Sequence, residues 1–536
     1  MEKYKRILDS VHGYIMIPEL YCDSILDTTY FQRLRRIEQT SARTLFPSAH
    51  HDRFIHSLGV FHLGSRLCMC LRGKNEGNKY EYPDDAESVY ESFCLACLLH
   101  DVGHSPFSHT FEDYYNDGNE NLKNALLAVI DDGEFAEDWK TYIKDSKPHE
   151  IMSAYVALRV YREFIKGRGA NPDLIARMIV GCRYPDKKNE GFKNAFIELL
   201  HSDVLDVDGL DYVCRDVWAS GYSTFSIDVD RLLDAIFVVK NPDEGGKFTV
   251  CYSTKAINEI ISVLGVKSFQ SAYVFCHHIV VYEQTLLVKA MESTAMYVQD
   301  LDHADYNSKE RTNALRNLCN YKSMLEQISL KSSHGEYPLI HPSDDDFVRL
   351  MKLIPNDYYV QQWLSRTYDL IPLWKSVVEY KVCFNDLWED EAFVSFLKSD
   401  KCRQFVVSQF GYEDHKVWLC DKIGPKDKVG KSSTVNLFIN GTPKKFNDIF
   451  RDDNFQIAHS DADFVYYFVP KEGKTGSTNV DDVVKSIKKR FMEMRGETKY
   501  VRRNTKKQNR ASVFFYIVVK IFWTVRNFVY EKRNSG

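Results

Sequence analysis

Apolar residues recur at spacings of three and four through the first 300 positions, which is the pattern of helices that bury one face. The clearest examples are Phe54, Leu58 and Phe61, then Ala154, Leu158 and Tyr161, and finally the stretch Leu26, Tyr30, Phe31, Leu34 and Ile37. The pattern predicts helices over these stretches. It therefore predicts a mainly α-helical fold for this part of the chain.

Alternating, strand-like runs are few and short. They cover residues 248–252, 417–420, 434–439 and 464–469. The turn-forming sequence "NPDEGGK" at 241–247 predicts a hairpin or a helix-to-strand turn just before the first of them. We therefore expect a mainly α protein with a helical core and minor β structure, most of it in the C-terminal third.

The chain has 536 residues, of which 44% are hydrophobic and 27% charged. This length exceeds what one core usually organises, so we expect a core over 1–300, a lobe over 301–480 and a tail over 481–536. Thirteen cysteines are scattered through a chain whose opening does not resemble a signal peptide. They predict reduced thiols and a cytoplasmic location.

The tail differs from the rest of the chain in charge. Residues 483–536 hold fifteen Lys/Arg and three acidic residues, in a chain whose formal net charge is −5. An apolar run from Val513 to Val525 lies among these basic residues, but it is shorter than the roughly 20 residues of a membrane-spanning helix. Three interpretations stay open: packing against the body or a partner chain, peripheral attachment to a membrane surface, and contact with nucleic acid.

Histidine and aspartate cluster at four places in the first 216 residues. One contains His56, one is "LLHDVGHSPFSHTFE" at 98–112, one contains His149, and one is "DVDGLDYVCRD" at 206–216. Imidazole and carboxylate together suit a first-row divalent metal, which acidifies bound water. His56, the adjacent pair in the second cluster and a later aspartate would supply four ligands.

The second cluster follows an apolar run, "FCLACLL", that should be buried, and buried His and Asp need partners. Adjacent residues on a regular helix point about 100° apart, so His100 and Asp101 can share one ion only at a helix end. Gly103 and Pro106 supply that ending. His104 and His109 would then lie near the metal, free for proton transfer or for binding phosphate oxygens.

These motifs resemble those of the HD-domain superfamily, and among its members the deoxynucleoside triphosphate triphosphohydrolases. The matching segments, in order, are "DSVHGYI" (9–15), "LDTTYFQRLRRIEQ" (26–39), "RFIHSLGV" (53–60), "LLHDVGHSPFSHTFE" (98–112), "HE" (149–150) and "DVDGLDYVCRD" (206–216). The resemblance covers roughly residues 1–300. It implies an HD-domain helical core.

The resemblance also implies roles for individual residues. The implied metal ligands are His56, His100, Asp101 and Asp208. The implied phosphate-binding and proton-transfer groups are His104, His109 and His149, with Glu112 as the carboxylate that orients a neighbouring histidine. The implied sugar and phosphate contacts are Gln39, Arg53, Tyr212 and Asp216. Tyr212 and Asp216 share one helix face with the metal ligand Asp208.

The implied reaction is attack of water on the α-phosphorus of a dNTP, with release of deoxynucleoside and triphosphate. One divalent ion per site, Mn, Mg, Fe or Ni, would be the cofactor. The resemblance further implies a homo-oligomer, a dimer or tetramer, activated by nucleotide at Asp27, Gln32 and Arg35. A structural interpretation of Asp27 as a helix N-cap is an alternative.

Two other functions stay open from the sequence. One is an HD phosphohydrolase that acts on another nucleotide or on a nucleic-acid phosphoester. The other is a nucleotide-sensing effector that works through the basic tail. The sequence does not select the base preference, the metal or the pathway.

Overall fold

The computed structural model describes residues 3–115, 121–143, 146–185, 190–202, 204–222, 227–301, 308–325, 328–421, 435–446, 464–473 and 476–496. The described chain forms two compact units. The first comprises residues 1–377 and 418–468, and the second comprises 378–417 and 469–536. The division expected near 300 and 480 stays a prediction, and the apolar run of the tail lies outside the described residues.

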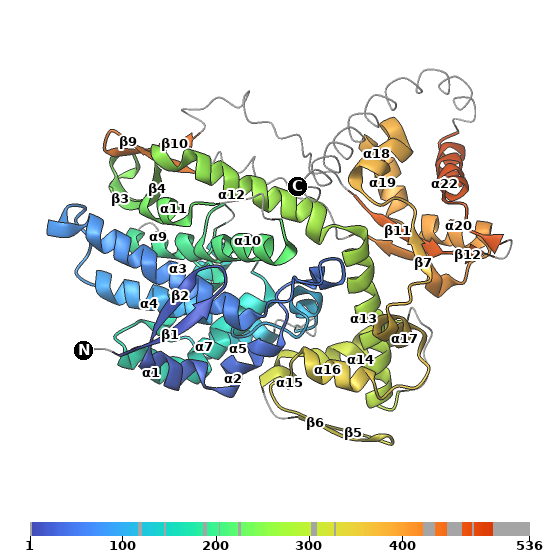
Figure 1. The fold of residues 1–536 in the computed structure, drawn as a ribbon, viewed down its shortest axis with the longest axis horizontal. Coiled ribbons are helices and arrows are strands. Elements are labelled where there is room, and N and C mark those ends of the chain that lie inside the picture. The colour runs from blue at the N-terminus through green and yellow to red at the C-terminus, as the bar shows by residue number, and fades with distance from the viewer. Residues whose placement is uncertain are drawn as a thin grey trace, which may run out of the picture. The chain divides into compact units, whose positions relative to one another are not determined.

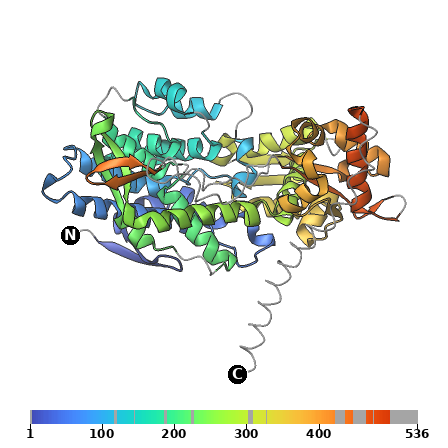
Figure 2. The ribbon, with the colours of Figure 1, turned by 90° about the horizontal axis from the view of Figure 1, so that it is seen from above.

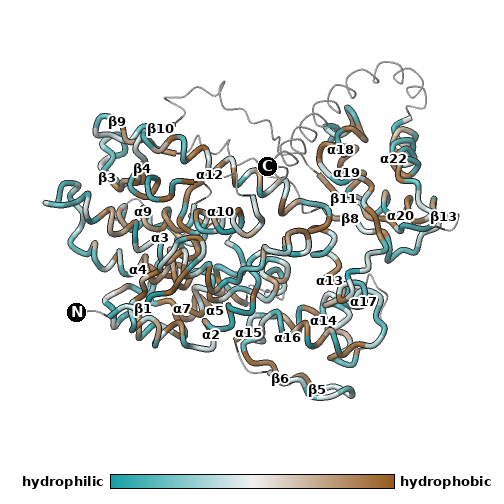
Figure 3. The backbone as a smooth tube through the Cα atoms, viewed as in Figure 1, coloured by the Kyte–Doolittle hydropathy of each residue, from teal (hydrophilic) through white to brown (hydrophobic). Residues whose placement is uncertain are grey.

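The core of the first unit is a set of packed helices, which confirms the expected fold class (Figure 1). The helices that position the site are α3 (Arg53–Lys74), α4 (Ala86–Leu99), α7 (Pro148–Gly167), α8 (Pro172–Val180), α9 (Gly191–Leu200) and α10 (Val207–Ser220). Apolar and polar stretches alternate along their backbones (Figure 3). Phe54, Leu58 and Phe61 are buried on α3, as their spacing predicts.

Shorter and later helices complete this unit. The short ones are α1 (Glu19–Tyr21), α2 (Thr29–Gln32), α5 (Asn121–Leu127), α6 (Phe135–Tyr142), α11 (Val229–Asp234) and α15 (Tyr321–Leu325). The longer ones are α12 (Ile257–Gln270), α13 (His278–Val298), α14 (Lys309–Cys319), α16 (Asp344–Met351) and α17 (Tyr358–Ser365). Helix α13 packs against α14 and α17.

The expected helix over Leu26–Ile37 is wrong in extent. Only α2 is α-helical there, and it is followed by a 3₁₀ turn over Arg33–Arg36. The N-cap of α2 is Thr28, whose hydroxyl accepts a hydrogen bond from the Phe31 amide, and not Asp27. The physical reason lies in the tertiary structure, because the buried Arg33 side chain reaches the carbonyl oxygens of Val102 and His104.

The strands form small sheets. Hairpins β1 (Tyr4–Asp9) with β2 (Gly13–Pro18) and β5 (Ile328–Ser332) with β6 (Gly335–Leu339) were not predicted from the sequence. The predicted strands appear as β4 (Lys247–Ser253), β8 (Trp418–Cys420), β9 (Asn436–Ile439) and β11 (Tyr466–Pro470). Their partners are β3 (Ile236–Asn241), β7 (Leu370–Pro372) and β10 (Thr442–Lys445), in sheets ordered β10-β9-β4-β3 and β7-β11-β8.

Strands far apart in the sequence thus lie side by side. Strand β9 pairs in parallel with β4, where Leu437 lies opposite Tyr252, and both views show the pair (Figures 1 and 2). Strands β3 and β4 are joined by the predicted turn at 241–247.

The second unit is a small helical body with one β-ribbon. Its elements are α18 (Val377–Phe384), α19 (Glu391–Leu397), α20 (Asp400–Phe410), α22 (Val480–Met494), β12 (Glu472–Gly473) and β13 (Gly476–Ser477). Phe393 and Phe396 of α19 pack on Phe491 of α22. The first residues of the basic tail are therefore part of a folded helix.

One described helix, Arg53–Lys74, has the length and apolar composition that a membrane span requires. Of its most apolar window, 67% is buried inside the protein. The same length and composition are found in core helices, and this helix carries His56 into the site described next.

Candidate active site

Three side chains from three helices converge on one point. His56 lies on α3, His100 follows directly after the end of α4, and Asp208 lies in the first turn of α10. The Nε2 atom of His56 is 3.0 Å from Asp208 Oδ1 and 3.2 Å from Nε2 of His100. His100 Nε2 lies 3.6 Å from the same carboxylate oxygen. Helix α4 ends at Leu99, so His100 sits at the helix end that the sequence predicted.

The hydrogen bonds behind these rings favour a cation between them. His56 Nδ1 lies 2.6 Å from Asp211 Oδ2, and His100 Nδ1 lies 2.9 Å from the Cys97 carbonyl oxygen. An Nδ1–H that donates to an oxygen leaves the Nε2 lone pair facing the other ring. Two such lone pairs and a carboxylate in one place form a donor set for a divalent metal. The three residues therefore fit a metal ion.

The charges around the group point the same way. Burial alone would lower the pKa of His56, but hydrogen bonds with Asp208 and Asp211 raise it to about 9. Burial also opposes the charged form of His100, and neighbouring Asp101 and Asp208 raise its pKa. The group therefore attracts positive charge strongly, as a proton or as a metal ion.

Asp101 lies beside the group, but one of its oxygens is engaged elsewhere. Its carboxylate oxygens are 3.6 Å from His56 Nε2 and 3.6 Å from His100 Nε2. Arg53 Nη1 donates to Asp101 Oδ2 at 2.6 Å. The role of Asp101 as a fourth ligand stays a prediction, and the structure makes Arg53 the residue that orients this carboxylate.

A second group of histidines surrounds Glu112. Glu112 Oε1 lies 3.0 Å from His109 Nδ1, and its Oε2 is hydrogen-bonded to His149 Nδ1. The His104 ring stacks on the His149 ring with centroids 4.4 Å apart. Burial would raise the pKa of Glu112, but the two histidine hydrogen bonds outweigh it and hold that pKa well below its usual range. Glu112 is thus an ionised acceptor for both rings.

His104 is fully buried, and within the described ranges neither of its ring nitrogens has a hydrogen-bond partner. Burial lowers its pKa well below the usual value, and the charge of Arg53 lowers it further. His104 is therefore a neutral imidazole with two free polar atoms. Buried polar atoms of this kind usually bind a ligand or water.

Two of the residues expected to contact the sugar, Gln39 and Asp216, are linked through His51. His51 Nε2 is 2.8 Å from Asp216 Oδ1, and the backbone N–H of Gln39 donates to the His51 carbonyl at 3.0 Å. The side-chain oxygen of Gln39 and Nδ1 of His51 are buried and have no hydrogen-bond partner in the part of the chain that the structure describes. Arg53 Nη2 donates to the Gln39 carbonyl oxygen. Tyr212 lies one turn before Asp216 on α10, with the Lys267 ammonium 5.4 Å from its ring centroid.

A groove leads away from the metal group. It has a volume of about 1150 Å³, and its lining includes Asp208, Asp206, Lys147, Glu150 and His201. His201 and Lys147 both approach Glu150 Oε1, at 3.3 and 3.8 Å. The groove gives Asp208 access to solvent.

The residues expected to bind an activating nucleotide lie outside both histidine groups. Arg35 donates to the Gln32 side chain at 3.0 Å, and its guanidinium covers the Phe54 ring at 3.5 Å. Asp27 is exposed, 3.8 Å from Lys5. Nucleotide binding by Asp27, Gln32 and Arg35 stays a prediction.

The sequence reasoning missed a buried charge network behind His56. Asp211 accepts from Arg215, approaches His12 Nε2 at 2.6 Å and holds His56, while Arg215 also donates to Asp9. Asp211 and Arg215 are four residues apart on α10, a spacing that could have marked them. Their partners are 155 to 206 residues away, which no local pattern shows.

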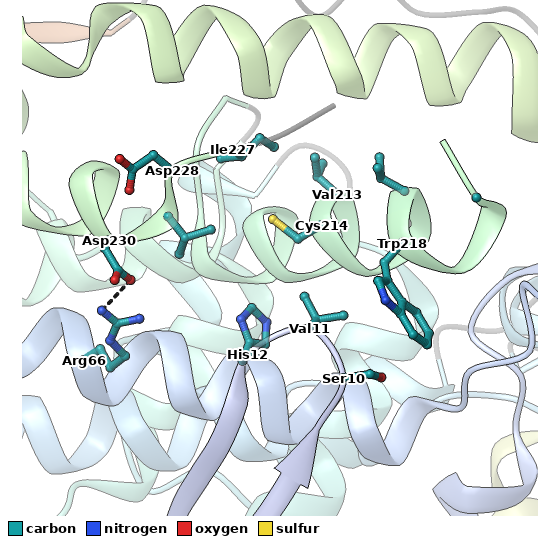
Figure 4. Close-up of a pocket in the computed structure, with 13 residues that line it drawn as sticks. Ser10, Val11, His12, Arg66, Val213, Cys214, Trp218, Ile227, Asp228 and Asp230 are labelled. Atoms are coloured by element: carbon teal, nitrogen blue, oxygen red, sulfur yellow. Dashed lines mark ion pairs between the residues drawn. The ribbon is translucent and has the colours of Figure 1, made fainter. Parts of the chain in front are cut away.

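His12 of this network also faces a cavity of about 850 Å³ (Figure 4). Cys214 and Trp218 line the cavity from α10, and Arg66 pairs there with Asp230 at 2.7 Å. Asp211 therefore lies between the metal group on one side and this cavity on the other.

Comparisons with known proteins show a family model and solved structures that this chain resembles. Residues 53–166 match the family model of the HD domain. A solved phosphohydrolase from Bacteroides thetaiotaomicron superposes with a TM-score of 0.55 at 20% identity, over 87% of this chain and 100% of the other. A hypothetical protein from Aquifex aeolicus gives 0.52 at 18% identity, over 87% and 96%. Residues 53–166 therefore carry an HD domain, and the resemblance found in the sequence is confirmed.

Several curated proteins are related to this chain in sequence. The chain is 26% identical to the deoxynucleoside triphosphate triphosphohydrolase SAMHD1 of Gallus gallus, over 62% of this chain and 52% of that protein. It is 25% identical to a putative HD domain-containing protein of Acanthamoeba polyphaga mimivirus, over 69% and 72%. It is 28% identical to the uncharacterized protein YwfO of Bacillus subtilis, over 44% of each chain. The chain thus spans about half the length of several of these relatives.

Metal removal is expected to lower the stability of the protein. A ligand that binds only the folded state stabilises it by about 2.7 kcal/mol at a hundredfold excess over its Kd. We expect the melting temperature to fall on exhaustive chelation and to recover on addition of one of Mn, Mg, Fe or Ni. Differential scanning calorimetry checks this, and an Asp208→Asn variant whose melting temperature still rises with the ion would contradict it.

Proposed function

We propose that this protein hydrolyses deoxynucleoside triphosphates to deoxynucleoside and triphosphate, with one divalent metal ion held by His56, His100 and Asp208, and with Asp101 beside it. The observation that carries the proposal is the arrangement of two adjoining groups: a metal-binding triad and an ionised Glu112 shared by two histidines. The relatives named as triphosphohydrolases support the substrate class.

When bound, the metal ion would polarise a phosphate oxygen and lower the pKa of water. The protein groups supply the rest of the reaction. Arg53 fixes the Asp101 carboxylate beside the metal ligands, and its buried guanidinium adds positive charge where negative charge develops on phosphate. The neutral His104 offers a nitrogen to a phosphate oxygen.

A histidine that is hydrogen-bonded to Glu112 transfers the proton. The Glu112 carboxylate accepts hydrogen bonds from Nδ1 of both His109 and His149. Nε2 is therefore the atom of each ring that gives or takes a proton. The ionised carboxylate stabilises an imidazolium at this position. Water adds its hydroxyl to the α-phosphorus and releases its other proton, and the bond from phosphorus to the 5′-oxygen breaks. The imidazolium gives a proton to that oxygen, and the proton released by water restores the imidazolium.

The sugar would lie against Gln39, Asp216 and Tyr212. A deoxyribose 3′-hydroxyl can donate to one of the unpartnered acceptors described above and can accept from another group. A pocket that closes around Tyr212 would disfavour the additional 2′-hydroxyl of a ribonucleotide.

Product analysis tests the proposal directly. The purified protein is incubated with each dNTP alone, with all four together and with the four ribonucleotides, in Mn or Mg, and the products are separated chromatographically. Equal amounts of deoxynucleoside and triphosphate are expected from dNTPs. Orthophosphate as the product would favour the other phosphoester function, and no product from any dNTP would contradict the proposal.

The same assay bears on activation by nucleotide. Hydrolysis that occurs only in the mixture, and that an Arg35→Ala variant loses, would support an activator site at Asp27, Gln32 and Arg35. Sedimentation with and without nucleotide would show whether a dimer or tetramer forms.

A further inference from the structure

The loop that joins His104 to His109 has an unusual backbone. Phe107 and Ser108 both adopt left-handed conformations, with φ of 55° and 54°. Side chains with a Cβ atom rarely adopt this conformation, and two in succession need support from their surroundings. The conformation determines where His104 and His109 lie relative to each other, so its support matters to the site.

That support comes from outside the HD match. Asp344 is the first residue of α16, almost 180 residues beyond the end of the matched region. The Phe107 amide donates to Asp344 Oδ1 at 2.6 Å, and the Glu38 amide donates to Asp344 Oδ2 at 3.0 Å. Only 8% of Asp344 is exposed. One buried carboxylate thus joins the histidine loop to the segment that carries Gln39.

The neighbouring contacts lead from this point to the metal group. The Ser108 hydroxyl donates to the Glu38 carbonyl and accepts from Arg53 Nε at 3.0 Å. Arg53 in turn holds Asp101. Arg33 adds a second link, because it donates to the His104 carbonyl at 2.7 Å and to the Pro342 carbonyl at 3.4 Å.

We propose that Asp344 is a positioning residue, which holds the loop of residues 102–110 in the conformation that brings His104 and His109 to the phosphates. It acts through the Phe107 and Glu38 amides and touches no reacting atom. The catalytic consequence rests on the proposed function, whereas the effect on the loop does not.

The protonation state of the Asp344 carboxyl determines the pH at which the proposal should be tested. Burial raises the pKa of Asp344 to about 7, nearby Glu38 raises it, and the two amides and Arg33 lower it. The carboxylate that accepts from both amides is therefore the form present above neutral pH, and the assays belong there. Other charged residues near Asp344 include Asp345, which pairs with Arg36 at 2.9 Å, and Arg43, Glu283 and Arg366, which line one pocket with it.

The test compares Asp344→Asn with Asp345→Asn in the full-length protein. Both changes remove one negative charge from the same helix turn, but the Asp345 side chain is 67% exposed and pairs only with Arg36 among the described residues. The Asn side chain at 344 offers one acceptor oxygen in place of two. We expect kcat to fall about 100-fold, since small misplacements of catalytic groups have effects of this size, with KM changed less than about twofold.

Hydrogen exchange supplies a readout that needs no activity. In Asp344→Asn, amides of residues 102–110 are expected to exchange faster, while those of α4 keep the rate of the unaltered protein. Should that variant not fold, Asp344→Glu keeps the charge, moves the carboxylate by one methylene, and is expected to change both readouts in the same direction.

Loop exchange and kcat equal to those of Asp345→Asn would overturn the proposal. If the unaltered protein released no triphosphate from any dNTP, the proposed function would fail, and the exchange rates of the loop would still decide whether Asp344 holds it.

Discussion

Replacing His100 by alanine is expected to abolish metal binding and to lower dNTP hydrolysis by about 10³-fold or more. His100 Nε2 lies within 3.6 Å of both other members of the triad, and its Nδ1 is held by the Cys97 carbonyl. Alanine removes one of three donors and leaves His56 and Asp208 to pair with each other. Metal content by mass spectrometry and release of triphosphate measure the two effects.

His50→Ala is the matched control for this prediction. His50 is a mostly exposed histidine that forms an ion pair with Glu38, at 2.9 Å, and it lies outside both histidine groups. We expect it to keep the metal and most of the activity. A His100→Ala protein that retained one equivalent of metal and near-normal hydrolysis would show that the ion binds elsewhere, with the Glu112 group as the next place to look.

The sequence predicted best what local periodicity determines. Phe54, Leu58 and Phe61 define α3, and the turn at 241–247 joins two strands as expected. The pattern failed at Leu26–Ile37, where the apolar spacing is helical but Arg33 bonds to carbonyl groups of a distant loop. The helix there gives way to a 3₁₀ turn, because the tertiary contacts outweigh the local preference.

In the candidate site too, the sequence predicted residues that lie in local motifs and missed residues that act through tertiary contacts. The motifs named His56, His100 and Asp208, and the structure places their ligand atoms within 3.6 Å of one another. The sequence did not identify Asp211 and Asp344 as part of the site. Each contacts residues that are far away in the chain, and an aspartate on a helix is most often solvated. Only the packing of α10 on α3, and of α16 on the histidine loop, shows that these two are buried and bonded.

Replacing Asp211 by alanine is expected to destabilise the protein by about 3–5 kcal/mol, the cost of leaving a buried charge without its partner. Asp211 is completely buried and accepts two bonds from Arg215, at 2.8 and 2.9 Å. Burial would raise the pKa of its carboxyl, but Arg215, His12 and His56 hold that pKa well below the usual range. The urea midpoint of unfolding measures the loss.

The same change is expected to weaken metal binding by about 10- to 100-fold, because Asp211 fixes the His56 ring from behind. Asp230→Ala is the control, since its ion pair with Arg66 is largely exposed and should contribute less than about 1 kcal/mol. Adding Arg215→Met together with Asp9→Asn to Asp211→Ala removes both charges that would otherwise lie unpaired, because Asp9 accepts from Arg215. This combination should restore part of the stability but none of the metal affinity. Equal recovery of both would mean that Asp211 acts on the metal group only by keeping the protein folded.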